Sequence, residues 1–315
     1  MQKLPVIVVC GPTASGKTAL AVSLAEIFGC EVISCDSMQI YKHMRIATAK
    51  PTEEEMRGIR HHLIDFLEPN QEFSVADYVR LASECISDIS SRGKIPLICG
   101  GTGLYVSSLI DNIGFDDTCS STEVRNELSK LADEKGGEYL LKLLNEFDPE
   151  TAQRLHPNNI PRIIRAIEVY KVSGTTMSEA IKRSKRESPY EPCMIGITCS
   201  DRQKLYDRIN LRVDKMLDMG LLAETESVLS DSDLKTSFQA IGYKELAPYF
   251  NGEKSLDECI EKLKRETRRY AKRQLTWFRR DDRIHWIYSD LYSEYSEIVN
   301  EAARIIRQSG ILKGE

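Results

Sequence analysis

Long hydrophobic runs are missing from this chain of 315 residues. No apolar stretch approaches the ~18 residues that a membrane-spanning helix needs, so we expect no membrane partner. The amino-terminal run MQKLPVIVVCG is too short for the hydrophobic region of a secretion signal, and it leads into a motif that must remain attached. These absences predict a cytoplasmic protein.

Closely spaced cysteine pairs are also missing. The nine cysteines are odd in number and scattered, and no CxxC pair occurs. Neither a zinc site nor a disulfide framework is therefore indicated. Reduced thiols in the cytosol are the simplest interpretation.

An overall positive charge is missing as well, since the net charge is −5. Hydrophobic residues make up 41% and charged residues 29%, which is ordinary for a globular protein and excludes a disordered or fibrous chain. The segment from Lys262 to Arg283 nevertheless holds ten Lys or Arg and three Asp or Glu, a local +7 that leaves −12 for the rest. Such a segment is either a solvated helix face or a contact for a polyanion. The interleaved Tyr270, Trp277 and Phe278 favour nucleic acid, because rings can stack on bases.

The first half of the chain alternates between strand and helix patterns. Val6 to Cys10, Glu31 to Cys35 and Ile95 to Cys99 are short apolar β-rich runs. Helical spacing separates them, over Thr18 to Phe28 and over Ser74 to Ser91. This alternation predicts an α/β fold with a doubly wound parallel sheet, whose ligands bind beyond the carboxyl ends of the strands.

The second half is mostly helical, and we divide the chain accordingly. Residues 1–113 and 193–290 are predicted to form the α/β core, which includes the basic helical segment. Residues 114–192 are predicted to form a helical insertion, because polar or proline-containing joints separate their helical stretches. Residues 291–315 are expected to be a carboxyl-terminal helix or tail. Nothing resembling a self-complementary apolar helix stands out, so we expect a monomer.

A phosphate-binding motif lies between the first predicted strand and helix. It matches GxxxxGK[ST] and consists of Gly11, Pro12, Thr13, Ala14, Ser15, Gly16, Lys17 and Thr18. Backbone amides and the helix dipole bind phosphate oxygens there, Lys17 adds a cation, and the Thr18 hydroxyl can hold Mg²⁺. The motif predicts a P-loop NTPase-like fold and a bound phosphate chain, but not what that chain carries.

Two further segments follow predicted strands. Asp36 and Ser37 end the second strand, where Asp36 is either a turn or cap residue or a general base over the bound phosphates. Gly100 to Gly103 end the third strand. They are either a turn of pure backbone geometry or a loop whose Thr102 hydroxyl orients a substrate beside Asp36.

Several charged side chains have both a structural and a functional interpretation. Arg208 and Arg212 share a helix face, where they either pair with nearby Asp214 and Glu224 or stabilise a leaving group. Arg162 and Arg165 likewise share a face that solvent alone would explain. For the adjacent pair His61-His62 we favour a structural role over metal binding, because no carboxylate or cysteine lies at a ligand spacing.

The motifs taken together resemble one family. GPTASGKT, DSMQIYKHM, ATAKP, HHLID, FSVADY, GGTGLY, RIIRAIEV, AIGYKEL and KRQLTWFRRD occur in this order over roughly residues 5–285, and they closely resemble the bacterial tRNA dimethylallyltransferases, also called tRNA isopentenyltransferases. The resemblance implies transfer of the five-carbon group of dimethylallyl diphosphate to N6 of adenosine 37 beside the tRNA anticodon, with Mg²⁺ as cofactor.

The resemblance also implies site residues. Thr13 to Thr18 would hold the diphosphate, Asp36 would be the general base, and Thr102 and Arg212 would help to place adenine and diphosphate. The implied tRNA contacts, together with those that the basic segment supplies, are Asp36, Ser37, Met38, Gln39, Thr102, Arg125, Pro161, Arg162, Arg165, Gly242, Tyr243, Lys244, Arg268, Arg269 and Arg273. The basic segment and the insertion would both grip the anticodon stem–loop.

Chemistry agrees with this interpretation. The exocyclic amine of adenine is a poor nucleophile, so it needs a positioned base and a good electrophile, and the phosphate-binding loop would hold the leaving group. Two rivals share part of the pattern. A small-molecule kinase with the same loop leaves the basic segment unused, and a nucleotide-dependent RNA-binding switch does not need Asp36 as a base.

Overall fold

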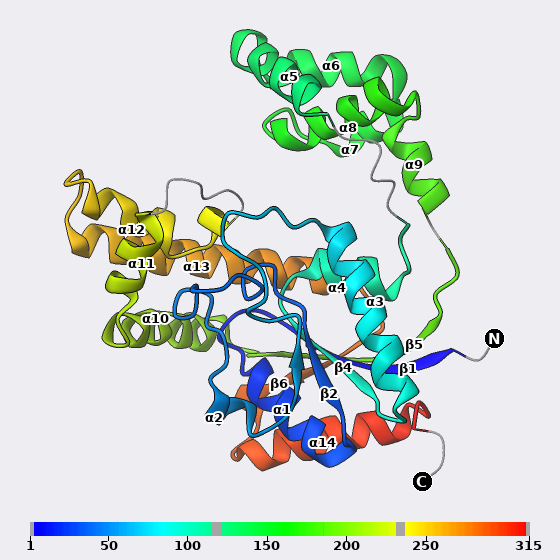
Figure 1. The fold of residues 1–315 in the computed structure, drawn as a ribbon, viewed down its shortest axis with the longest axis vertical. Coiled ribbons are helices and arrows are strands. Elements are labelled where there is room, and N and C mark those ends of the chain that lie inside the picture. Colours follow the sequence, from blue (N-terminus) through cyan, green and yellow to red (C-terminus); the bar gives the residue numbers. More distant parts are fainter. Residues whose placement is uncertain (1–2, 115–120, 185, 231–236, 313–315) are drawn as a thin grey trace. The chain divides into compact units, whose positions relative to one another are not determined.

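The computed structural model describes residues 3–114, 121–184, 186–230 and 237–312. It divides the chain into two compact units, one made of residues 1–110 and 188–315 and the other of residues 111–187 (Figure 1). We call them the sheet unit and the helical unit. The expected insertion spanned residues 114–192, so its predicted end lies beyond that of the helical unit. The reason is that the returning strand already begins at Tyr190.

A six-stranded sheet forms the centre of the sheet unit. Its strand order is β3-β2-β4-β1-β5-β6, and every neighbouring pair is parallel. The strands are β1 (Leu4–Cys10), β2 (Glu31–Ser34), β3 (His61–His62), β4 (Pro96–Gly100), β5 (Tyr190–Thr198) and β6 (Ile284–Tyr288). The predicted parallel α/β sheet is therefore confirmed, although the sequence patterns did not indicate β3 and β6.

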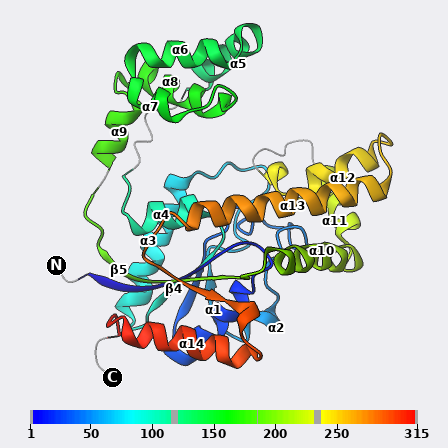
Figure 2. The ribbon, with the colours of Figure 1, turned by 180° about the vertical axis from the view of Figure 1, so that it is seen from behind.

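Alternate residues of β1 enter two different cores, as the pleat of a strand requires. Ile7 and Val9 pack against α1 and α14, whereas Val6 and Val8 pack against α3 and α4. Helices therefore cover both faces of the sheet (Figures 1 and 2). Burial on both faces explains why the strands are continuous apolar runs without alternation.

The helices of the sheet unit begin and end at recognisable signals. Their bounds are α1 (Lys17–Phe28), α2 (Glu53–Met56), α3 (Val75–Ser91), α4 (Gly103–Ile110), α10 (Arg202–Asp218), α11 (Leu221–Leu229), α12 (Tyr243–Phe250), α13 (Leu256–Phe278) and α14 (Tyr295–Gln308). Ser74 caps α3 in a reciprocal pair with Asp77. Gly29 ends α1 in the left-handed conformation.

The helical unit has a core of its own. Its helices are α5 (Thr122–Lys135), α6 (Gly137–Phe147), α7 (Pro149–Arg154), α8 (Ile160–Ser173) and α9 (Met177–Ser184). Leu128, Leu140, Leu144 and Ile163 are fully buried in one cluster. A separate core is what an independently packed insertion requires.

The carboxyl-terminal segment is part of the sheet unit. Ala302 and Ile306 of α14 are buried in the same core as Leu20 and Leu24 of α1. The expected helix or tail over residues 291–315 is therefore a packed helix as far as the chain is described. Within the described ranges, no helix is both long and apolar enough to cross a membrane.

Candidate active site

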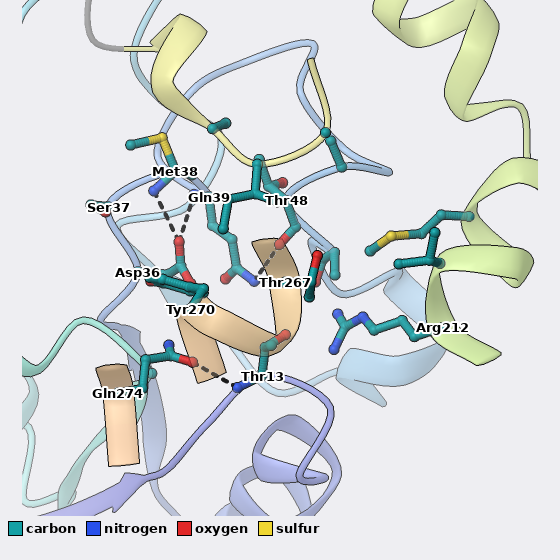
Figure 3. Close-up of a pocket in the computed structure, with 18 of the residues that line it drawn as sticks. Thr13, Asp36, Ser37, Met38, Gln39, Thr48, Arg212, Thr267, Tyr270 and Gln274 are labelled. Atoms are coloured by element: carbon teal, nitrogen blue, oxygen red, sulfur yellow. Dashed lines mark hydrogen bonds between the residues drawn. The ribbon is translucent and has the colours of Figure 1, made fainter. Parts of the chain in front are cut away.

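A cavity of about 270 Å³ lies at the carboxyl edge of the sheet, and we call it the carboxyl-edge pocket. Its lining comes from the glycine-rich loop, the end of β2, residues 47–49, and helices α10 to α13 (Figure 3). Among its polar lining residues are Thr13, Lys17, Thr18, Asp36, Gln39, Arg212, Tyr270, Arg273 and Gln274. This is the edge at which parallel sheets bind ligands.

The glycine-rich loop between β1 and α1 is built to receive an anion. Gly11 has φ 142°, and a Cβ there would lie 2.3 Å from the carbonyl oxygen of Ile197, so no other residue fits. Lys17 donates from Nζ to the Pro12 carbonyl at 2.6 Å, and burial lowers its pKa to about 8. The buried Ser15 hydroxyl has no hydrogen-bond partner among the described residues. The loop therefore offers a cation and an unsatisfied hydroxyl, which fits a phosphate chain.

Asp36 faces the same pocket from the end of β2. Its Oδ1 accepts the backbone N–H groups of Met38 at 2.9 Å and Gln39 at 3.3 Å, so the turn that follows β2 fixes the carboxylate (Figure 3). Within the described chain, Oδ2 has no hydrogen-bond partner. One oxygen is thus held in place while the other is open for chemistry, which combines the turn and base interpretations of this residue.

Arg212 of α10 lies across the pocket from this loop (Figure 3). Burial lowers its pKa and the charge of Asp36 opposes that effect, but the guanidinium remains charged at neutral pH. Arg208, one turn earlier, instead donates to the Ser289 hydroxyl at 2.9 Å and does not line the pocket. The two arginines that share a helix face therefore have different roles, and only Arg212 belongs to the site.

Thr102 is hydrogen-bonded to the residues on either side of Asp36. Its Oγ1 accepts the Ser37 backbone N–H at 3.1 Å, and its own N–H donates to the Cys35 carbonyl at 3.2 Å. A Cβ on Gly100 would lie 2.0 Å from that carbonyl, so the close approach of the two loops requires glycine. Thr102 does not line the pocket, so the structure assigns its hydroxyl to the loop that holds Asp36.

The wall formed by residues 45–49 is held from two sides. The Gln39 side chain donates to the Thr48 and Ala49 carbonyls at 3.3 and 3.1 Å. Glu224 of α11 accepts the backbone N–H groups of three consecutive residues, 45–47, at 2.8–3.1 Å. Of the alternatives left open for Arg208 and Arg212, pairing with Glu224 is therefore not the one that the described contacts show.

Gly242, Tyr243 and Lys244 occupy the start of α12. Gly242 and Lys244 line the pocket. Tyr243 is fully buried, and its hydroxyl donates to Glu224 at 2.9 Å. Its side chain is therefore used inside the protein, and an RNA contact at this position would have to come from the backbone.

Helix α13 turns one polar face toward the pocket. Thr267, Tyr270 and Gln274 lie on that face at helical spacing, and burial raises the pKa of Tyr270. Gln274 accepts the Thr13 N–H at 2.8 Å and donates to the Gly101 carbonyl at 2.9 Å. Sequence reasoning missed Gln274 and Thr267. The signal was there, since uncharged polar residues at i, i+3 and i+7 interrupt a basic helix.

The three arginines predicted on α13 have different surroundings. Arg268 donates to Asn210 of α10 at 2.6 Å, which holds two helices together. Arg269 is exposed and pairs with Glu266 on its own helix. Arg273 lines the pocket, with its guanidinium 5.7 Å from the Tyr270 ring centroid. Only Arg269 and Arg273 are therefore placed for an external anion.

The helical unit holds the remaining predicted RNA contacts. Arg125 and Arg165 both donate to Glu168, whose side chain is fully buried while their own remain about half exposed. Pro161 and Arg162 are exposed at the start of α8. These side chains present positive charge on the surface of their own unit.

A metal site made only of protein ligands is absent from the described residues, where no group of three or more His, Cys, Asp or Glu is placed to hold an ion. His62 lies in β3 and pairs with Glu31 at 2.8 Å, in line with the structural role that we favoured. The pocket instead offers the Thr18 hydroxyl beside the anion-binding loop.

The glycine-rich loop between β1 and α1 makes this a P-loop protein. Because Asp36 lines the same pocket, the loop can hold the leaving group of a group transfer. The chain matches the IPP transferase family over residues 39–281. It is 50% identical to the tRNA dimethylallyltransferase of Caldanaerobacter subterraneus subsp. tengcongensis over 94% of this chain and 95% of that protein. It is 49% identical to the enzyme of that description from Acetivibrio thermocellus, over 97% of this chain and 98% of the relative.

Solved structures agree with the sequence matches. The tRNA isopentenylpyrophosphate transferase of Bacillus halodurans is 42% identical and superposes with a TM-score of 0.72, with 99% of each chain covered. A eukaryotic dimethylallyltransferase acting on tRNA is 29% identical with a TM-score of 0.82, covering 95% of this chain and 77% of that one. The chain belongs to the IPP transferase family, and it is a transferase.

Proposed function

We propose that this protein transfers the dimethylallyl group of dimethylallyl diphosphate to N6 of adenosine 37 of tRNA and releases diphosphate. The observation that carries the proposal is the arrangement of the carboxyl-edge pocket. It places the anion cradle, the open oxygen of Asp36 and the guanidinium of Arg212 on the lining of one cavity. The family membership and the named relatives point to the same reaction.

The diphosphate of the donor fits the cradle. Amides at the start of α1, the Lys17 ammonium and the Ser15 hydroxyl would bind its oxygens, and Arg212 would neutralise the charge that develops as it leaves. Val213, Met216 and Leu221 give the same pocket an apolar side, which suits a five-carbon chain. The cradle thus holds a leaving group where a kinase would hold a nucleotide.

Asp36 supplies the acceptor side of the reaction. The N6 lone pair of adenine attacks C1 of the donor while the bond from C1 to the diphosphate oxygen breaks. Oδ2 of Asp36 takes the proton that N6 loses, so charge and atoms balance. A base within hydrogen-bond reach is the requirement, and Oδ1 is already held by the loop, which leaves Oδ2 to take the proton.

Magnesium fits the residues present, and we propose that the Thr18 hydroxyl would hold it beside the diphosphate. The metal would supply neutralisation of the leaving group when bound. No cluster of carboxylates competes for it in the described part of the chain, so most of its remaining ligands would be substrate oxygens and water. Its absence should therefore weaken donor binding far more than tRNA binding.

The tRNA partner would be bound through its anticodon stem–loop. Adenine must leave its loop to reach a pocket, which single-stranded RNA allows at a cost of a few kcal/mol. Exposed Arg269 and Arg273 on α13, and Arg125, Arg162 and Arg165 on the helical unit, would contact phosphates. We further propose a monomer that acts on tRNA in the cytoplasm.

One assay tests the proposed function. The protein is incubated with unmodified tRNA and Mg²⁺ and with either labelled dimethylallyl diphosphate or labelled ATP. Label that enters tRNA from the diphosphate donor alone is the expected result, and loss of that label when adenosine 37 is replaced by guanosine checks the position. Phosphate transfer from ATP without prenylation would indicate a kinase instead, and RNA binding without any covalent product would indicate a switch.

A further inference from the structure

The sheet stops short of the two loops that carry the chemistry. Strands β1 and β4 pair in register up to Cys10 and Gly100. Beyond that point, the ladder no longer fixes the distance between the cradle and the Gly100–Gly103 loop. That distance matters, because transfer between a donor and an acceptor is sensitive to displacements of about 1 Å.

The side chain of Gln274 spans this gap. Its Oε1 accepts the Thr13 N–H of the cradle at 2.8 Å (Figure 3). Its Nε2 donates to the Gly101 carbonyl at 2.9 Å. Gln274 is 6% exposed, so neither bond competes with bulk water. A Cβ on Gly101 would lie 2.2 Å from Nε2, which shows how closely the amide fits between the loops.

The backbone and one further hydrogen bond connect this amide to the base. Gly101 precedes Thr102, whose hydroxyl accepts the Ser37 N–H beside Asp36. On the other side, Thr13 opens the loop that contains Ser15 and Lys17. A glutamine suits this position because its side chain both donates and accepts, whereas Glu only accepts, Lys only donates and Met does neither.

We propose that Gln274 is a positioning residue that sets the separation between the diphosphate cradle and the loop of the catalytic base. It does not touch the reacting atoms, since both of its polar atoms are used by the protein. Because it lies on α13, it also fastens the basic helix to both loops. The assignment rests on the proposed function for the roles of the two loops.

The test compares Gln274→Met, which keeps the side-chain length and removes both bonds, with Gln203→Met as control. Gln203 lies exposed on α10 and donates to Asp207 on the surface. Inorganic pyrophosphate binding is measured by calorimetry without tRNA, and the prenylation rate in a single turnover with both substrates saturating. We expect Gln274→Met to bind pyrophosphate about tenfold more weakly and to react about 30-fold more slowly.

Affinity for tRNA without donor should stay within about twofold, because the exposed face of α13 is unchanged. The control should match the wild type in all three measurements. A purely structural role predicts a lower melting temperature, but an unchanged pyrophosphate affinity and an unchanged prenylation rate at temperatures below it. That result would overturn the proposal.

A second variant protects against a folding defect. Gly101→Ala leaves Gln274 in the chain but places a methyl group where its Nε2 lies, so it should reproduce both losses. Wild-type activity in both measurements from this variant would also overturn the proposal. If the wild type binds pyrophosphate but does not prenylate tRNA, the proposed function fails, while the affinity comparison still decides whether Gln274 shapes the cradle.

Discussion

Two carboxylates at opposite ends of β2 show how one strand serves both stability and chemistry. Glu31 begins the strand and is 3% exposed, and it is saturated by Arg92, Lys94 and His62. Asp36 follows the strand's other end and is held by two backbone amides, with Oδ2 open to the pocket. A carboxylate with every oxygen occupied stabilises the fold, whereas one with a single oxygen occupied is oriented and can still react.

The largest effect should follow a change at the open carboxylate. Asp36→Asn preserves shape and one acceptor but removes the base, so turnover should fall by about 10²–10⁴-fold. Its tRNA affinity should stay within a fewfold of the wild type. Single-turnover prenylation and a binding isotherm measure the two quantities, and turnover retained at the wild-type level would remove Asp36 from the mechanism.

The saturated carboxylate should show the reverse pattern. Glu31→Gln leaves Arg92 and Lys94 without their anion, and since both are partly exposed we expect a loss of about 2 kcal/mol in unfolding free energy. Turnover below the melting range should be unchanged. Urea unfolding and prenylation assays check both expectations, and a variant that loses turnover while keeping its stability would break the comparison.

The stability that Glu31 contributes depends on pH. Arg92 above all, then His62 and Lys94, hold the pKa of Glu31 far below its ordinary value. The contribution of Glu31 is therefore complete above about pH 5 and is lost as pH falls below the unfolded pKa of about 4.3. The difference between wild type and Glu31→Gln in urea unfolding should shrink over that range, and a constant difference would contradict the assignment.

The cations near these two carboxylates also differ, because Arg92 pairs with Glu31 whereas Lys17 shares the pocket with Asp36. Glu31 raises the pKa of Arg92, while burial lowers that of Lys17 to about 8. A bound diphosphate restores the charge of Lys17, so binding takes up a proton and affinity falls as pH rises through 8. Calorimetry with dimethylallyl diphosphate and no tRNA should show about a tenfold loss between pH 7.5 and 9. Lys17→Met should bind weakly with a flat profile, and an equal slope in both proteins would place the titration elsewhere.

The smallest expected effect concerns a third carboxylate, that of Glu224, which accepts hydrogen bonds from backbone amides. Glu224→Gln keeps one acceptor for the amides of residues 45–47 but turns an NH₂ group toward them. The wall of the pocket should loosen, raising the KM for the donor about threefold to fivefold with little change in kcat. Exposed Glu226 on the same helix offers the control, Glu226→Gln. Initial rates decide, and equal KM values for the two variants would make the Glu224 contacts purely structural.

The sequence predicted those structural features that short, continuous segments determine. The strand, glycine loop and helix around Lys17 form one continuous segment, and Asp36 directly follows a buried strand. Both could be predicted because parallel strands place their carboxyl ends at one edge. The helical insertion was recognisable because its pattern changes abruptly after Gly114.

Contacts between distant segments could not be predicted in this way. Thr13 and Gln274 are separated by 261 positions, and the bonds of Glu224 to residues 45–47 join positions 177–179 apart. Charge patterning shows that α13 is basic but not which residues face inward, so Arg268 was predicted to be on the RNA side. The burial of Tyr243 was not predicted for a related reason, since its hydroxyl pairs with Glu224, which lies on another helix.

One hydrogen bond of the sheet unit joins the point where the chain leaves this unit to the point where it returns. The chain leaves the sheet unit after Ile110 and returns at Ser188, whose hydroxyl donates to the Ile110 carbonyl at 2.6 Å. The next residue, Pro189, accepts the Leu4 N–H, so strand pairing resumes at once. Evolution can therefore lengthen, shorten or exchange the stretch between these two points without shifting the register of β1 and β5, so the inserted unit can diverge while the pocket residues stay in place.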